Sequence, residues 1–212
     1  AYIGKRDAFA ARLNANGNRI WHTFMGSTLN DYGISIAVDD VGNSYVSGRS
    51  VADWGFPVNA YMGGDDAFAA KLDTDGNRMW NTFMGSKNYD VGGFVTLDND
   101  GNLYVGGYSE SNWGKPINSF GGGSDAFAAH LTPEGVLIWN LFLGSEHPDY
   151  GSPITVDNDG NIYMTGNSTA SWGSPVNNYV GGRDVFVTKP RTTRCTLIIL
   201  KKRSGKSIPM CL

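Results

Sequence analysis

The sequence predicts an all-β fold, built from a repeated unit of four short antiparallel strands. Three observations lead to this prediction. Residues of the same type recur every 59 positions, and the segments between Gly-rich turns are about five or six residues long. No stretch of about 11 residues has the period of roughly 3.6 that marks an amphipathic helix. We therefore expect strands throughout the repeated region.

The 59-residue period holds without gaps across roughly 190 residues. Four series of residues mark it: Asp7, Asp66, Asp125 and Asp184; Trp21, Trp80 and Trp139; Trp54, Trp113 and Trp172; and Asp39, Asp98 and Asp157. A constant interval inside one chain indicates duplication of a single structural unit. The interval also rules out a β-helix, whose repeat is much shorter, and a sandwich, whose strands do not repeat in register.

The second copy shows the elements of one unit in order. Its first hairpin pairs residues 67–72 (AFAAKL) with 78–83 (RMWNTF), and its second pairs 93–97 (GFVTL) with 103–107 (LYVGG). These segments are rich in aromatic and β-branched residues, as strands are. The turns between them, DTDGN and DNDGN, contain the Gly that supplies a positive φ. Four antiparallel strands repeated in this way are typical of the blades of a β-propeller.

The unit also resembles a known repeat. The stretches GGDDAFAAKLDTDGNRMWNTFMG at 63–85 and DYGISIAVDDVGNSYVSG at 31–48 are similar to the bacterial SBBP-type repeat, a seven-bladed β-propeller-like family. The resemblance covers about residues 1–189. It implies a bacterial protein that is extracellular or attached to the cell surface, and it implies no catalytic residues.

Residues 1–189 are expected to form the propeller region. An outer hairpin of a preceding blade at 1–27 comes before blades at about 31–85, 90–144 and 149–189. A closed propeller needs at least about four blades, and three to three and a half are too few. We therefore expect a fragment of a larger propeller. The alternative is an arc of three to four blades that self-associates through its open blade edges.

Residues 190–212 depart from the repeat. This tail is basic and contains both cysteines, so the rest of the chain has neither a disulfide framework nor a Cys-based zinc site. A frameshift or a truncation would produce such a change. The segment TLIIL at 196–200 lies where the next repeated Trp is due, and it could still supply a surrogate fourth strand to the last blade.

Composition restricts the classes of function. The hydrophobic fraction of 41% and the charged fraction of 17% are those of a chain with a folded core. The net charge of −3, without a cluster of Lys and Arg, argues against a nucleic acid partner. No apolar run approaches the length of a membrane span. The three His residues do not repeat, and neither a Ser-His-Asp arrangement nor a GxSxG motif occurs. We expect no catalytic residues, no cofactor and no enzyme activity.

Two series of Asp residues each allow a functional and a structural interpretation: cation ligands or turn residues for the first, a catalytic acid or a structural acceptor for the second. The turns at 98–102 and 157–161 resemble a calcium loop, but they are too short for an EF-hand and lack its final Glu. We interpret them as hairpin turns and expect no metal site. Asp31, Asp90 and Asp149 precede the inner strands, and we expect them to accept hydrogen bonds from backbone amides or to join blades.

Two series of Trp residues have different predicted roles. Trp21, Trp80 and Trp139 lie inside the outer strands and are expected to pack against the neighbouring blade. The second series lies in a loop of about 17 residues with the motif WGxP. Each loop also contains an Asn and a further aromatic residue, and the candidate ligand-binding set is Trp54, Asn59, Tyr61, Trp113, Asn118, Phe120, Trp172, Asn177 and Tyr179.

The WGxP loops allow two interpretations. An aromatic ring beside an amide suits a sugar, because the ring stacks on apolar faces and the amide bonds hydroxyls. Alternatively, Pro stiffens the loop and Trp folds over the end of its own sheet as a clamp. We favour the clamp. The function expected is a non-enzymatic propeller scaffold, extracellular or on the cell surface, for an unidentified protein or glycan partner. The alternative is a lectin-like module with one weak site per blade.

Overall fold

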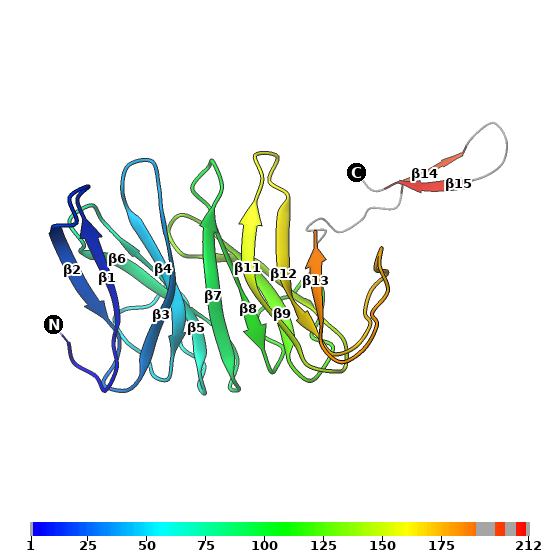
Figure 1. Cartoon of the computed structure of the whole chain (residues 1–212), viewed down its shortest axis with the longest axis horizontal. Coiled ribbons are helices and arrows are strands. Elements are labelled where there is room, and N and C mark those ends of the chain that lie inside the picture. Colours follow the sequence, from blue (N-terminus) through cyan, green and yellow to red (C-terminus); the bar gives the residue numbers. More distant parts are fainter. Residues whose placement is uncertain (1, 190–197, 202–206, 211–212) are drawn as a thin grey trace.

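The computed structural model describes residues 2–189, 198–201 and 207–210, and these residues contain strands and no helix (Figure 1). Two sheets have four antiparallel strands each, paired in chain order. The first consists of β3 (Asp31–Val38), β4 (Ser44–Ser50), β5 (Asp66–Leu72) and β6 (Arg78–Met84). The second consists of β7 (Asp90–Leu97), β8 (Leu103–Ser109), β9 (Asp125–Leu131) and β10 (Leu137–Leu143). The predicted all-β fold with four-stranded, propeller-type blades is confirmed.

Smaller sheets flank these two. β1 (Ala8–Leu13) pairs with β2 (Arg19–Met25), and β11 (Asp149–Val156), β12 (Ile162–Ser168) and β13 (Asp184–Thr188) form a three-stranded sheet. The tail contributes β14 (Ile198–Lys201) and β15 (Ser207–Met210), which pair with each other. The segment expected as a surrogate fourth strand, 196–200, lies partly outside the described residues. Its described part belongs to β14 and does not pair with β13.

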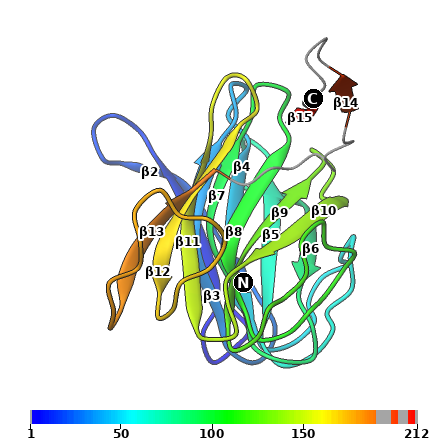
Figure 2. The same cartoon turned by 90° about the vertical axis from the view of Figure 1, so that its right-hand side faces the viewer.

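The sheets stand side by side (Figures 1 and 2), and the first strand of each later sheet, β7 or β11, packs against the preceding sheet. β7 packs against β3, β4 and β5, and β11 packs against β7, β8 and β9. Gly92 makes this close approach possible. A β-carbon there would lie 2.6 Å from the carbonyl oxygen of Gly48 and 3.0 Å from the β-carbon of Ala67. The small residues Gly92, Gly48 and Ala67 therefore let β7 lie close to β4 and β5 of the preceding sheet.

Larger side chains join the outer parts of neighbouring blades. The Trp80 indole donates a hydrogen bond of 3.1 Å to the carbonyl oxygen of Pro133, in a hairpin turn of the next sheet. Its ring lies against Gly135, which has a φ of 83°. Trp21 makes the same bond, of 2.9 Å, to Thr74. The predicted packing of these Trp residues against a neighbouring blade is confirmed for Trp21 and Trp80.

The middle strands of the two complete sheets, such as β5 and β9, are buried on both faces, because side chains point to alternate faces and each face packs on other parts of the chain. Phe68 and Phe127 are fully buried at equivalent positions of β5 and β9. Among the residues that the structure describes, no helix is long and apolar enough to cross a membrane.

Candidate functional site

The WGxP loops lie against their own blades. The side chains of Trp54 and Trp113 are each 6% exposed. The Trp113 ring meets Phe127 edge-on at a centroid distance of 5.2 Å and Phe142 at 5.8 Å. Trp54 contacts Phe68 and Phe83 in the same geometry. Rings buried in this way cannot stack on a ligand, and the geometry is that of a clamp.

The middle of each loop covers the outer edge of its sheet. The Val58 amide donates to the carbonyl oxygen of Asn81 on β6 at 2.8 Å, and the Phe83 amide donates to that of Asn59 at 3.1 Å. The Asn59 side-chain amide adds a bond of 2.6 Å to the Thr82 hydroxyl. An outer edge strand would otherwise present unpaired amides and carbonyls, which invite pairing with other chains. We call this feature the edge cap.

The second complete blade repeats the edge cap. Ile117 donates to Asn140, and Phe142 donates to Asn118, at 2.8 and 2.9 Å. The Asn118 side chain donates to the Phe142 carbonyl oxygen at 2.6 Å. Phe120 packs edge-on against Phe142 with the ring centroids 5.8 Å apart. The amides and rings of this loop are therefore engaged within the blade.

The other predicted ligand-binding residues are packed on their own sheet in the first complete blade and are more exposed in the last blade. Tyr61 packs on Phe83 with centroids 5.5 Å apart, and its hydroxyl donates to Gly64. In the last blade Trp172 is half-buried against Phe186, the Tyr179 hydroxyl donates to backbone carbonyls, and Asn177 is exposed. The interpretation of the nine residues as a sugar-binding set stays a prediction, to which the buried Trp54 and Trp113 lend no geometric support.

A cleft separates the loops of consecutive blades. It has a volume of about 710 Å³ and is lined by Asn59, Met62, Lys87, Asn112 and Trp113, among others. Its walls come from the edge cap of one blade and the start of the next WGxP loop. The cleft is the place where a small ligand could reach these loops.

The Asp-rich hairpin turns use their carboxylates internally. The two oxygens of Asp98 accept bonds from the amides of Asp100 and Asn102, the Asn102 side chain and the Tyr104 hydroxyl. Burial alone would raise the pKa of Asp98, but these hydrogen bonds outweigh it and lower the pKa. Among the described residues no group of three or more His, Cys, Asp or Glu side chains could hold a metal ion. The turns therefore have the interactions of hairpin turns.

The carboxylates at the starts of β3, β7 and β11 accept hydrogen bonds from the short connections that lead into these strands. Asp90 accepts bonds from the amide and the hydroxyl of Ser86 at 2.7 and 2.9 Å, and from the hydroxyl of Ser109. Asp31 and Asp149 accept the equivalent bonds from Ser27 and Ser145. The predicted role as acceptors of backbone amides is confirmed.

A second carboxylate lies beside Asp90 and beside Asp149. A β-carbon at Gly85 would lie 2.6 Å from Asp66 Oδ1 and 3.0 Å from Asp90 Oδ2, so both carboxylates approach the same point. Asp66 is fully buried, and its Oδ1 has no hydrogen-bond partner. Burial raises the pKa of Asp66 to about 7, and the charge of Asp90 adds to the shift. We call Asp66 and Asp90 a junction pair.

Asp125 and Asp149 form the equivalent junction pair around Gly144. Burial raises the pKa of Asp125 to about 6, with a smaller contribution from the charge of Asp149. The sequence predicted a structural role for Asp90 and Asp149, but Asp66 and Asp125 served only to mark the period, and the pairing was missed. The constant offset of the two Asp series in every repeat is the signal that could have shown it.

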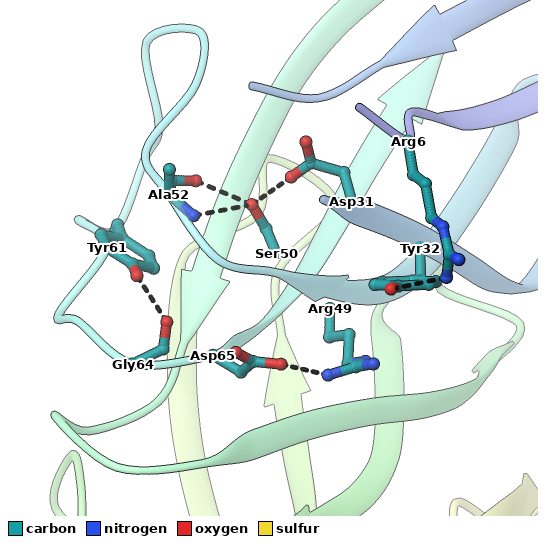
Figure 3. A network of polar contacts seen from close by, with 9 residues as sticks. All are labelled: Arg6, Asp31, Tyr32, Arg49, Ser50, Ala52, Tyr61, Gly64 and Asp65. Atoms are coloured by element: carbon teal, nitrogen blue, oxygen red, sulfur yellow. Dashed lines mark hydrogen bonds and ion pairs between the residues drawn. The ribbon is translucent and has the colours of Figure 1, made fainter. Parts of the chain in front are cut away.

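A row of tyrosine and arginine side chains crosses the end of the blades at which β3, β7 and β11 begin. The Arg6 guanidinium donates a hydrogen bond of 3.0 Å to the Tyr32 hydroxyl (Figure 3). On the other side of Tyr32, the Arg49 guanidinium lies 4.3 Å from the ring centroid and forms an ion pair with Asp65. Arg49 is also 5.3 Å from the ring of Tyr89, on the connection that leads into the next blade.

The same row continues across the following blades. The ring centroids of Tyr89 and Tyr108 are 6.1 Å apart, and those of Tyr108 and Tyr150 are 5.0 Å apart with the rings edge-on. The Arg183 guanidinium carbon lies 5.6 Å from the centroid of the Tyr150 ring. We call these residues the tyrosine–arginine row: Arg6, Tyr32, Arg49, Asp65, Tyr89, Tyr108, Tyr150 and Arg183. Burial, followed by the neighbouring Tyr89, raises the pKa of Tyr108 to about 12, so its hydroxyl stays neutral at physiological pH.

The row occupies positions at which the repeats differ. Residue 49 is Arg, whereas the equivalent residues are Tyr108 and Asn167, and Tyr32 is replaced by Val91 in the next unit. All members of the row are at least partly exposed. Sequence reasoning missed the row because it followed recurring residues. Departures from the repeat at strand ends were the available signal.

Comparison with known protein families agrees with this architecture. A family model described as SBBP, beta-propeller repeat, matches residues 20–53 and 141–171. These two segments match the SBBP β-propeller repeat. Each matched segment contains an Asp that accepts a hydrogen bond from the amide of a preceding Ser, Asp31 or Asp149, followed directly by a tyrosine of the row. A comparison with curated proteins found no match.

Proposed function

We propose that this SBBP repeat chain is a non-enzymatic scaffold that binds its partner through the tyrosine–arginine row. In the two complete blades, the recurring Trp, Asn and Asp side chains are engaged in clamps, edge caps and junction pairs within the fold. The residues of the row are partly exposed, and they place aromatic rings and guanidinium groups at positions where the residue type differs from repeat to repeat. Tyr and Arg are the residue types that contribute most to binding at interfaces.

The resemblance to the SBBP family supports a role outside the cytoplasm, and we propose an extracellular or cell-surface location. The partner is then a protein or a glycan. A propeller fold alone does not specify function, so the proposal depends on the row and not on the architecture.

A panel of immobilised glycans and peptides, probed with the purified chain, tests the proposal. The row variant is Tyr32→Leu with Tyr150→Leu, which keeps apolar bulk and removes two rings. The control is Phe56→Ala, which alters a side chain that is 96% exposed and outside the row. We expect binding by the parent chain and by the control, and loss of binding by the row variant. Circular dichroism checks that each variant is folded.

Two outcomes would contradict the proposal. Binding that survives in the row variant would place the partner elsewhere. A turnover of any panel member that disappears with a single substitution would make the chain an enzyme.

The cleft between consecutive loops supports one alternative, a weak carbohydrate site in each blade. Lys87→Ala changes an exposed side chain at this cleft without touching the row. Glycan binding that is lost in this variant, and kept in the row variant, would favour the alternative.

A further inference from the structure

We propose that the ligand of the tyrosine–arginine row is an acidic polysaccharide, a chain of sugar rings that carry carboxylates. This inference rests on the proposed function, because it names the ligand class of the same surface. It is carried by the charges of the row, the placement of its rings and the state of the nearby sheet edges.

The charges of the row favour an anionic ligand. Asp65 is neutralised by Arg49, and this is the one ion pair that the structure records within its described part. Arg6 and Arg183 are exposed, and their recorded contacts in the row are with tyrosines, Tyr32 and Tyr150. A guanidinium is always charged, and its planar fork fits a carboxylate with two parallel hydrogen bonds. The two ends of the row therefore offer donors for carboxylates of a ligand.

The rings of the row suit sugars placed between those carboxylates. Tyr89, Tyr108 and Tyr150 are partly exposed, and each has an apolar ring that can contact the C–H faces of a sugar and a hydroxyl that can bond its oxygens. The ring of Tyr32 instead has the guanidinium groups of Arg6 and Arg49 against it, so this tyrosine holds the two arginines in place. Packed sheets are about 10 Å apart, which is close to the length of two linked sugar rings. A single polysaccharide chain along the row would thus meet one aromatic group at each blade, with Arg6 and Arg183 near its ends.

The outer sheet edges of the two complete blades argue against an acidic peptide as the ligand, although β13, which follows Arg183, has an outer edge that no described strand covers. Extended peptides are commonly bound by adding a strand to an open sheet edge. The outer edges of β6 and β10 already bond to their edge caps at 58–59 and 117–118. The row itself lies at strand ends and presents side chains, which suits a ligand recognised by its ring faces and carboxylates.

The test measures binding of three soluble polymers by titration calorimetry at low ionic strength. Polygalacturonate supplies rings and carboxylates, its methyl ester supplies rings without charge, and polyglutamate supplies carboxylates without rings. We expect the chain to bind polygalacturonate more tightly than either of the others, and the affinity to fall as salt is added.

Charge variants sharpen the measurement. The Arg6→Gln and Arg183→Gln double variant should weaken polygalacturonate binding roughly tenfold, since two charge-assisted contacts are lost. Glu110→Gln should tighten binding roughly twofold, because Glu110 is an exposed acid directly after β8, and its amide bonds to Tyr89. Phe56→Ala should leave the affinity unchanged.

Several results would overturn the inference. These are no binding of polygalacturonate, equal binding of its methyl ester, or tighter binding of polyglutamate. If a neutral glycan or a peptide binds instead and the Tyr32→Leu, Tyr150→Leu variant loses it, the scaffold proposal stands and the acidic polysaccharide is wrong. If binding of polygalacturonate is insensitive to every row substitution, both proposals fail.

Discussion

Replacing Asp66 by Asn should stabilise the chain at alkaline pH and not at acidic pH. The pKa of Asp66 is raised from 3.8 to about 7, so folding favours its protonated form. The stabilisation that accompanies such a shift is fully present below pH 4 and is lost as the pH rises through 7. Above pH 7 the folded chain must hold a charged, buried carboxylate beside Asp90. Asn has nearly the same shape and cannot ionise.

The magnitude follows from the shift. One pKa unit corresponds to about 1.4 kcal/mol, so a shift of about three units corresponds to roughly 4 kcal/mol between acidic and alkaline conditions. About two of these three units act between pH 5 and pH 7, where the Asp66 carboxyl is ionised in the unfolded chain and still protonated in the folded chain. We expect the effect of Asp66→Asn on the free energy of unfolding to be more favourable at pH 8 than at pH 5 by about 3 kcal/mol.

Urea unfolding at pH 5 and pH 8, followed by Trp fluorescence, measures the difference. Asp73→Asn is the matched control. Hydrogen bonds from Asn77 lower the pKa of Asp73, which lies in an exposed hairpin turn, so its charged form is favoured in the folded state. The control should lose stability and gain none at pH 8. An effect of Asp66→Asn that is the same at both pH values would refute the account of the junction pair.

Two further predictions concern contacts that recur in the blades. Gly135→Ala should destabilise the chain by about 2–4 kcal/mol, because a β-carbon at a φ of 83° would also meet the Trp80 ring at 2.9 Å. Gly160→Ala has a similar φ in open space and should cost only about 1–2 kcal/mol; equal losses in chemical unfolding would count against the Trp80 contact. Trp113→Ala should cost about 3–5 kcal/mol, as expected for a buried aromatic residue, and Trp172→Ala clearly less, because Trp172 is half-buried. Thermal melting compares these two variants, and a larger loss at Trp172 would contradict the clamp.

The sequence was sufficient for the fold because one pattern recurs. The 59-residue interval, together with Gly in each hairpin turn, defined the four-stranded unit and placed Trp80 at a blade interface. The same recurrence argued that Trp113 is a clamp. Each of these predictions depends on local pattern and on the equivalence of units, which a single sequence can show.

The junction pairs and the row depend on contacts between units. Asp66 and Asp90 belong to neighbouring blades, and only the way β7 packs on β5 brings them to Gly85. The row joins Arg6, Tyr32 and Arg49, which come from three different segments and have no common motif. A search for recurring residues excludes such positions, because what they share is a place in space and not a place in the repeat.

The edge cap has a consequence for how chains of this kind can change in length. Each complete blade satisfies the backbone of its outer strand with its own loop, as residues 58–59 do for β6. A blade therefore does not need a neighbour to cover that strand. Duplication or loss of a whole unit leaves the backbone hydrogen bonds between the outer strand and the edge cap of every remaining complete blade as they were. The number of units can then change during evolution, and each added or lost unit lengthens or shortens the tyrosine–arginine row or changes which side chains it presents.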